Sequence, residues 1–87
     1  MAILMTATVP GLDAATYDQI TAGIGSTILS APGFRAHAAY PDADGWTVVE
    51  VWDSEANWRE FFDANVRDHL PPEAEQSVTE LHNVVLP

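Results

Sequence analysis

The spacing of apolar residues changes along the chain and marks a succession of short structural elements. Ile3–Val9 is an apolar, threonine-rich run that ends at Pro10-Gly11, and its small length favours a strand buried on both faces. From residue 12 or 13 to about residue 30, apolar side chains recur at spacings of three and four, which predicts an amphipathic helix. These side chains are Tyr17, Ile20, Ile24 and Ile28. Gly23 and Gly25 lie within it, and each costs about 1 kcal/mol relative to alanine, so an irregular second half is expected.

A β-hairpin is predicted next. Phe34–Tyr40 alternates in polarity, and Trp46–Trp52 is rich in valine, threonine and tryptophan. Asp42–Gly45 lies between them and supplies turn residues. The two runs are therefore expected to pair as neighbouring antiparallel strands.

The length of the hairpin connection decides which side chains share a face, because successive side chains of a strand point to opposite faces. A connection of two or four residues would place His37 opposite Glu50 or Trp52. One face would then carry Arg35, His37, Ala39, Trp46, Val48, Glu50 and Trp52, and the other Phe34, Ala36, Ala38, Tyr40, Thr47, Val49 and Val51. A connection of three or five residues would mix the two sets.

The last part of the chain predicts a second helix and a final strand. Asp53-Ser54 offers a helix N-cap, and Glu55 follows in the first turn, where the helix dipole favours negative charge. Apolar side chains at helical spacing then form an aromatic face: Trp58, Phe61, Phe62, Val66 and Leu70. Pro71-Pro72 stops this helix, and Ser77–Leu86 is expected to form the last strand.

The predicted order β-α-β-β-α-β is the split βαβ, ferredoxin-like plan, an α+β fold in which both helices cover one face of an antiparallel sheet. No repeat, low-complexity tract or flexible linker divides the sequence, so residues 1–87 are expected to form one domain. The uncovered face still carries apolar side chains, and so short a chain buries a small fraction of its surface. A partner sheet from a second copy is therefore expected to cover this face.

Charge and composition exclude several classes of partner. The chain has 13 acidic residues against three arginines, contains no lysine, and carries a formal charge of -10. Nucleic acid and anionic membrane both need cationic side chains, so neither is expected to bind.

Without cysteine, and with three scattered histidines, the chain has no thiolate site or zinc-finger spacing, and no metal is expected. The N-terminal apolar run lacks a positive leader and is too short to cross a bilayer, which predicts a cytoplasmic protein.

His37 and Glu50 are the sharpest candidates for chemistry. They would lie on one face of adjacent strands, among Trp46, Trp52 and Arg35. A carboxylate beside an imidazole orients the ring, and a histidine held in this way can take up and release protons near neutral pH. The pair is therefore the candidate general acid–base. In the alternative interpretation, Glu50 pairs with Arg35 or His37 for purely structural reasons.

Other residues are candidates for binding a substrate. Trp58 belongs to the aromatic face, which is expected to pack as core, although aromatic walls also suit a flat organic ligand. His69 ends the aromatic helix, where a cation at the C-terminus is favourable, and a capping role is expected there. His82, in the last predicted strand, would line either the cavity of His37 or an interface. The candidate substrate-binding residues are Arg35, Trp46, Trp52, Trp58, His69 and His82.

The chain resembles small bacterial proteins of the dimeric α/β-barrel superfamily, especially antibiotic-biosynthesis-monooxygenase-like proteins. The resemblance is carried by the run GFRAHAAYPDADGWTVVEVWDSEANWREFF and the late LHNVVL, and most clearly by Gly45–Phe62, where a strand ending VEVWDSE leads into an aromatic helix. The superfamily includes cofactor-independent oxygenases acting on polyketide-derived phenols, haem-degrading enzymes, polyketide cyclases, isomerases and members with no known reaction. The strand-1 asparagine of the haem-degrading members is not matched at Thr6 or Thr8.

The resemblance implies a homodimer whose two sheets pack into a barrel, with a pocket between the sheet and the helices of each subunit. It also implies a cofactor-independent monooxygenase of a small aromatic or polyketide-like metabolite, because an electron-rich phenolate can itself deliver an electron to oxygen. His37 and Glu50 would handle protons, while Trp46, Trp52 and Trp58 would shape the cavity. Two alternatives stay open: a polyketide cyclase or isomerase that uses the same pair, and a noncatalytic ligand-binding dimer.

Overall fold

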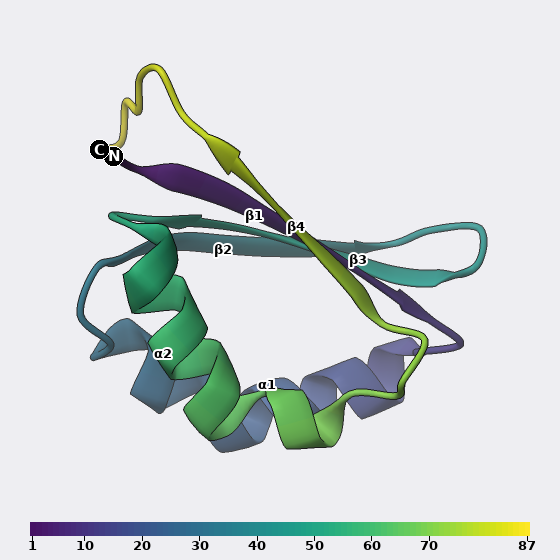
Figure 1. The fold of residues 1–87 in the computed structure, drawn as a ribbon. Coiled ribbons are helices and arrows are strands. Elements are labelled where there is room, and N and C mark those ends of the chain that lie inside the picture. The colour runs from purple at the N-terminus through teal and green to yellow at the C-terminus, as the bar shows by residue number, and fades with distance from the viewer.

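Four antiparallel strands form one sheet in the order β2-β3-β1-β4, and two helices lie against one of its faces (Figure 1). The computed structural model describes all 87 residues, Met1–Pro87. The elements are β1 (Ile3–Pro10), α1 (Ala14–Leu29), β2 (Phe34–Pro41), β3 (Gly45–Trp52), α2 (Glu55–Asn65), a 3-10 turn η1 (Arg67–His69) and β4 (Glu75–Glu80). The predicted β-α-β-β-α-β order and the ferredoxin-like α+β fold are confirmed.

Both helices begin at side-chain caps that the sequence supplies. The Asp13 carboxylate accepts a hydrogen bond from the Thr16 backbone nitrogen at 2.8 Å, and this bond lowers the pKa of Asp13. The Ser54 hydroxyl accepts one from the Asn57 backbone nitrogen at 3.1 Å. Each cap satisfies an N–H that has no partner inside its own helix, so it fixes where the helix starts.

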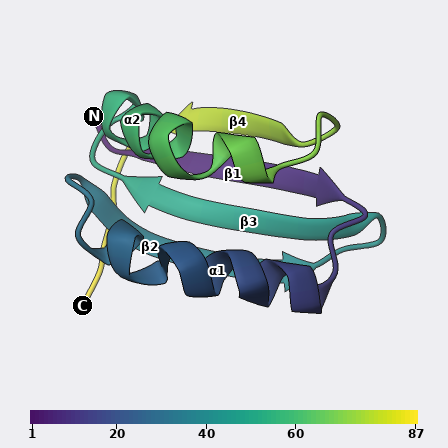
Figure 2. The ribbon, with the colours of Figure 1, turned by 90° about the horizontal axis from the view of Figure 1, so that it is seen from below.

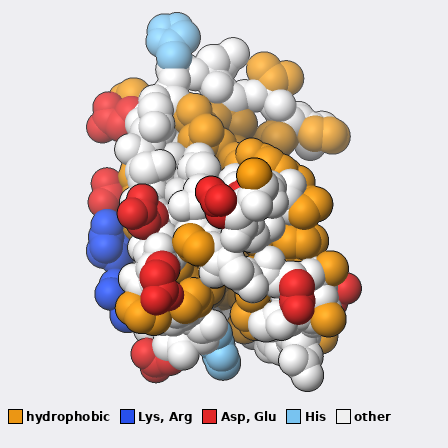
Figure 3. Space-filling model, turned by 90° about the vertical axis from the view of Figure 1, so that its right-hand side faces the viewer, with side chains coloured by type: hydrophobic (Ala, Val, Ile, Leu, Met, Phe, Trp, Pro, Cys, Tyr) orange, Lys and Arg blue, Asp and Glu red, His pale blue; other side chains and the backbone are white.

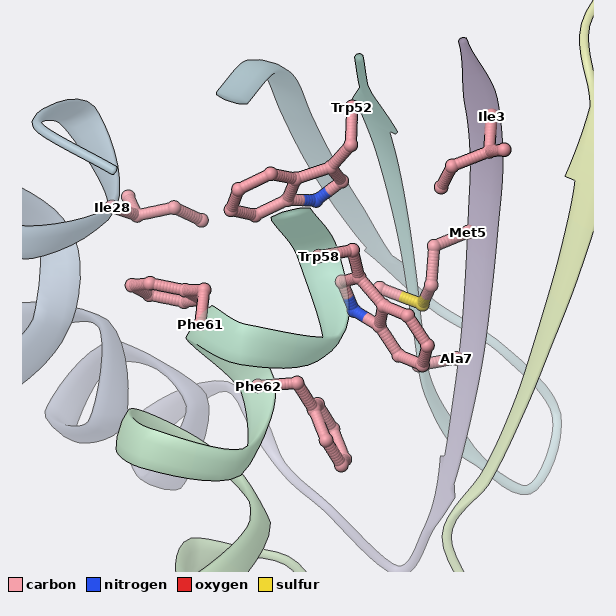
Figure 4. Close-up of a cluster of buried hydrophobic side chains, with 8 residues drawn as sticks. All are labelled: Ile3, Met5, Ala7, Ile28, Trp52, Trp58, Phe61 and Phe62. Carbon is pink, nitrogen blue, oxygen red and sulfur yellow. The ribbon is translucent and has the colours of Figure 1, made fainter. Parts of the chain in front are cut away.

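The core lies between the helices and strands β1 and β3 (Figure 4). Its buried side chains are Ile3, Met5, Ala7, Ile28, Trp52, Trp58, Phe61 and Phe62. Every second residue of β1 is buried, so this central strand has one face on the core and is not buried on both faces as predicted. Trp52 is the only large side chain with no exposed surface, and the Phe61 ring packs against it at 5.5 Å between ring centroids. The predicted aromatic face of α2 is thus the main helical contribution to the core.

The two helices cover different parts of the sheet. Figure 2 shows α1 running along the side of β2 and β3, and α2 lying over β1 and β4. The side chains between the helices and the sheet come from both helices and from the inner sheet face. Elements far apart in the sequence therefore meet in this layer. The opposite sheet face has no helix on it, and the C-terminal segment after β4 returns to the side of the N-terminus (Figure 1).

Strand β2 is shifted in register near its start, and this changes which residues share a face. Phe34 pairs with Trp52, but Ala36 pairs with Val51, so Arg35 falls in an irregularity between the two pairs. Phe34 consequently packs against the core and Arg35 points to solvent. The prediction that Arg35 shares the face of His37 and Phe34 the opposite face is wrong for this reason. The rest of the hairpin follows the predicted pairing, with His37 opposite Glu50.

Two predicted elements end earlier than expected. Helix α2 stops at Asn65 and continues only as the 3-10 turn Arg67–His69, whereas the apolar spacing predicted a helix to Leu70. Leu70 lies directly before Pro71 and is extended, which ends the 3-10 turn at His69. Strand β4 covers Glu75–Glu80 rather than residues 77–86. The first residue of its partner β1, Ile3, pairs with Glu80. The Leu81 nitrogen then donates to the Ala2 carbonyl, and the pairing of the two strands ends there.

The surface is acidic with few cations. Figure 3 shows acidic side chains scattered over one side of the molecule, basic side chains confined to one edge, and apolar side chains exposed between them. Two of the three arginines make ion pairs along α2, Arg59 with Glu55 at 3.0 Å and Arg67 with Asp63. No helix has the length and apolar character needed to cross a membrane.

Candidate functional site

His37 and Glu50 are in direct contact on the helix-covered face of the sheet. They form a cross-strand pair between β2 and β3, and His37 Nδ1 lies 2.7 Å from Glu50 Oε2. Glu50 is buried, with 7% of its surface exposed, whereas the His37 side chain keeps 26% of its surface exposed. A buried carboxylate is costly unless it is hydrogen-bonded. The imidazole therefore helps to hold Glu50 in the interior while itself reaching the surface.

The second carboxylate oxygen of Glu50 is also occupied. The Trp52 indole Nε1 donates to Glu50 Oε1 at 2.9 Å. When Glu50 is ionised its carboxylate only accepts hydrogen bonds, and Nδ1 of His37 is then the donor in this contact. This arrangement leaves the lone pair of a neutral imidazole on Nε2, which is the atom of His37 that can receive a proton.

Tyr17 occupies that lone pair. Its hydroxyl lies 2.6 Å from His37 Nε2 and is the donor when the imidazole is neutral. The Tyr17 ring is held by stacking on Trp46, with 5.2 Å between ring centroids and 27° between planes. Four residues from two strands and one helix thus form a continuous hydrogen-bonded chain, Tyr17–His37–Glu50–Trp52, which we term the proton relay.

The sequence interpretation missed Tyr17 as a functional residue. It counted this residue only as one position of the apolar stripe of α1. The available signal was chemical: Tyr17 carries the only hydroxyl-bearing ring in that stripe, and buried tyrosine hydroxyls normally find a partner. Its partner is 20 residues away, so no local spacing pointed to His37.

A partly enclosed apolar cavity of about 70 Å³ lies beside the proton relay, between the sheet and both helices. Thirteen of its 16 lining residues are hydrophobic, and Thr21, His37 and Glu50 are the others. Trp58 and Tyr17 are among the hydrophobic ones. His37, Glu50 and the Tyr17 ring thus line a cavity whose other walls are almost entirely apolar.

The tryptophans predicted to bind substrate differ in position. Trp58 lines the cavity directly. Trp52 is in the core and reaches the site through its bond to Glu50. Trp46 supports the Tyr17 ring without lining the cavity, and its Nε1 is buried without a hydrogen-bond partner.

Three predicted site residues lie away from the cavity. Arg35 pairs with Asp53 at 2.6 Å, an exposed contact whose hydrogen bond raises the pKa of Arg35. His69 ends the exposed 3-10 turn after α2, and His82 lies beyond the end of β4, also exposed. The structure therefore does not bring Arg35, His69 or His82 together with His37. No group of three histidine, cysteine, aspartate or glutamate side chains is arranged to hold a metal ion.

Comparison with known proteins identifies the fold. No family model and no curated protein sequence matches the chain. Among solved structures, SnoaB, a cofactor-independent oxygenase from Streptomyces nogalater, is similar with a TM-score of 0.65 and 14% identity over 97% of this chain and 95% of that one. A monooxygenase of Streptomyces coelicolor in complex with the ligand nanaomycin D has a TM-score of 0.58 and 20% identity over 99% and 91% of the two chains.

A third similar structure has no assigned reaction. A dimeric ferredoxin-like protein of unknown function from Thermobifida fusca has a TM-score of 0.67 and 15% identity over 93% of this chain and 92% of that one. The three similar structures thus include two oxygenases and one protein of unknown function. At this level of identity the likeness shows the ferredoxin-like fold alone.

Proposed function

We propose that this chain is a cofactor-independent monooxygenase that acts on a small aromatic or polyketide-like metabolite bearing an acidic hydroxyl group. The observation that carries the proposal is the proton relay at the wall of an apolar cavity. Apolar surroundings suit an aromatic substrate, and the relay supplies a base for its hydroxyl. The oxygenases among the structural neighbours support the reaction class.

The relay would remove the proton of the substrate hydroxyl, and the phenolate that forms is the reductant. A substrate hydroxyl next to Tyr17 gives its proton to the tyrosine oxygen as the Tyr17 proton moves to His37 Nε2. The imidazolium formed is stabilised by Glu50, whose carboxylate holds Nδ1–H at 2.7 Å. Trp52 fixes the other carboxylate oxygen, so Glu50 keeps one orientation throughout.

The phenolate then reacts with molecular oxygen, which is the co-substrate and the oxidant. Transfer of one electron gives a phenoxyl radical and superoxide, and these combine to form a carbon–oxygen bond. The resulting peroxide takes back the proton held by the relay. Its O–O bond breaks as the ring C–H proton leaves, which gives water and a ring carbonyl. For 1-naphthol the balance is C10H8O + O2 → C10H6O2 + H2O, so the substrate loses four electrons and both oxygen atoms are reduced.

We also propose that the chain works as a homodimer. The sheet face opposite the helices carries half-buried Leu4, Val49 and Val51, together with Tyr40, which is 53% exposed. Apolar side chains in one row of an uncovered sheet favour a second sheet as partner. The similar structure from Thermobifida fusca is that of a dimeric protein, which supports a dimer here.

Oxygen consumption tests the proposal against its rivals. The protein is mixed with 1-naphthol or 1,5-dihydroxynaphthalene under ¹⁸O₂, and the expected result is one oxygen molecule consumed per quinone, with one labelled atom in the product. A polyketide cyclase or isomerase would use the same relay without oxygen, and product formation under nitrogen would select it. A noncatalytic ligand-binding dimer would bind the phenol and leave it unchanged under both gases.

A further inference from the structure

An apolar groove runs along the outside of the molecule between α1 and the edge strand β2. Its volume is about 410 Å³, and five of its eight lining residues are hydrophobic. Ile24, Gly25 and Leu29 border it from α1, and Phe34 and His37 border it from β2. Leu29 is 76% exposed, so an apolar side chain stands at the rim without a partner. The groove is therefore open to solvent but apolar inside.

This groove shares a wall with the apolar cavity beside the proton relay. Thr21, Ile24 and His37 line both spaces. Thr21 follows Tyr17 by one helical turn, so the groove runs along α1 away from the proton relay. The exposed part of His37 faces out of the core, while Nδ1 is bonded to the buried Glu50. A molecule in the groove can thus contact His37 without first entering the cavity.

The apolar cavity alone is too small for the proposed substrate. Pockets that enclose organic ligands usually measure roughly 300–1,000 Å³, compared with about 70 Å³ here. The groove supplies space of the required size immediately beside the relay. Its lining offers few hydrogen-bonding groups other than His37 and Thr21, which suits an apolar ring system with one polar end.

Gly25 keeps this space open. A Cβ atom built on Gly25 would meet no atom within 4 Å, so a side chain there would extend into free volume rather than collide with the fold. Gly23, two residues earlier in α1, also has no atom within 4 Å of its Cβ position, but it does not line the groove. The two glycines are therefore a matched pair for testing the groove.

We propose that the groove between α1 and β2 is the subsite that binds the apolar body of the substrate, with the substrate hydroxyl directed at the His37–Tyr17 contact. The ligand class is a flat aromatic molecule with a phenolic hydroxyl, larger than a single ring. This inference rests on the proposed function for the identity of the ligand class, and on the groove and its shared residues for the place where it binds.

The test compares Gly25→Leu with Gly23→Leu, using 1-naphthol as the probe and titration calorimetry under nitrogen. Both substitutions gain the same helix propensity, and the Cβ atom of neither meets a neighbouring atom within 4 Å. Gly25→Leu is expected to raise the Kd for 1-naphthol at least tenfold, while Gly23→Leu leaves it within a factor of two of wild type. Melting temperatures of both variants verify that each is folded.

The outcomes separate the subsite from the reaction. Equal binding by both folded variants would overturn the groove as the subsite, and so would the absence of 1-naphthol binding by wild type. A selective loss in Gly25→Leu supports the subsite even if wild type consumes no oxygen with the bound phenol. In that case the proposed oxygenase function fails and the aromatic-binding groove stands.

Discussion

The indole nitrogen of Trp52 donates to Glu50 Oε1 across 2.9 Å inside the core. The two residues are separated by one position on β3, so their side chains leave the strand on the same face. Trp52 is fully buried and Glu50 nearly so, which means that water cannot replace this hydrogen bond. The contact thus links the most buried aromatic side chain to the carboxylate that orients His37.

Replacement of Trp52 by phenylalanine is expected to leave Glu50 Oε1 without its donor. The free energy of unfolding should fall by about 1–3 kcal/mol, because an unsatisfied buried acceptor loses its hydrogen bond without regaining water. Urea denaturation of Trp52→Phe, Glu50→Ala and the double variant measures the coupling, expected at about 0.5–3 kcal/mol. Additive effects of the two substitutions would show that the bond does not contribute.

Removal of the Tyr17 hydroxyl is expected to break the relay and keep the fold. Tyr17→Phe retains the ring that stacks on Trp46, so the free energy of unfolding should change by only about 1 kcal/mol. Turnover of a phenol substrate should fall about 100-fold, the lower end of general acid–base contributions. Tyr40→Phe is the control, because the exposed Tyr40 ring lies on the other sheet face. Equal turnover by both variants would remove Tyr17 from the mechanism.

The sequence predicted one half of the relay and missed the other for a physical reason. His37 and Glu50 lie in a hairpin, where strand alternation and a short connection fix which side chains face each other. Tyr17 meets His37 through the packing of a helix on a sheet, and helical periodicity gives its face but not its partner. Arg35 was misplaced because the register shift at Phe34 and Ala36 has no signature in the alternating pattern.

Asp42 is expected to make stability depend on pH in the acid range. A hydrogen bond from the Thr47 hydroxyl, followed by bonds from the Asp44 and Gly45 backbone, lowers the pKa of Asp42 in the folded chain. The contribution of Asp42 to the free energy of unfolding is therefore fully present above its pKa in the unfolded chain, about 3.9. This contribution is lost as the pH falls through the lower pKa of the folded chain. Urea midpoints measured from pH 6 down to pH 2.5 should fall less steeply for Asp42→Asn than for wild type. Parallel curves would contradict this role of Asp42.

A charge on the uncovered sheet face is expected to separate the proposed homodimer. Val49 pairs with Thr6 and Ala38 on the neighbouring strands, so Val49→Asp would bury a carboxylate between the two sheets. Analytical ultracentrifugation at micromolar concentration should show a wild-type dimer and a Val49→Asp monomer. Ala22→Asp, on the exposed face of α1, adds the same charge and should stay dimeric. A monomeric wild type would contradict the dimer proposal.

The central claim is that the relay deprotonates a bound phenol, and the ultraviolet spectrum of 1-naphthol bound to the protein under nitrogen tests it most directly. Phenols such as the tyrosine side chain titrate near pH 10, so free 1-naphthol is almost entirely neutral at pH 7. Bound to wild type at pH 7, it should show the naphtholate absorption band, and bound to His37→Ala it should show the neutral spectrum. A neutral spectrum in both complexes, with binding established for each, would contradict the account.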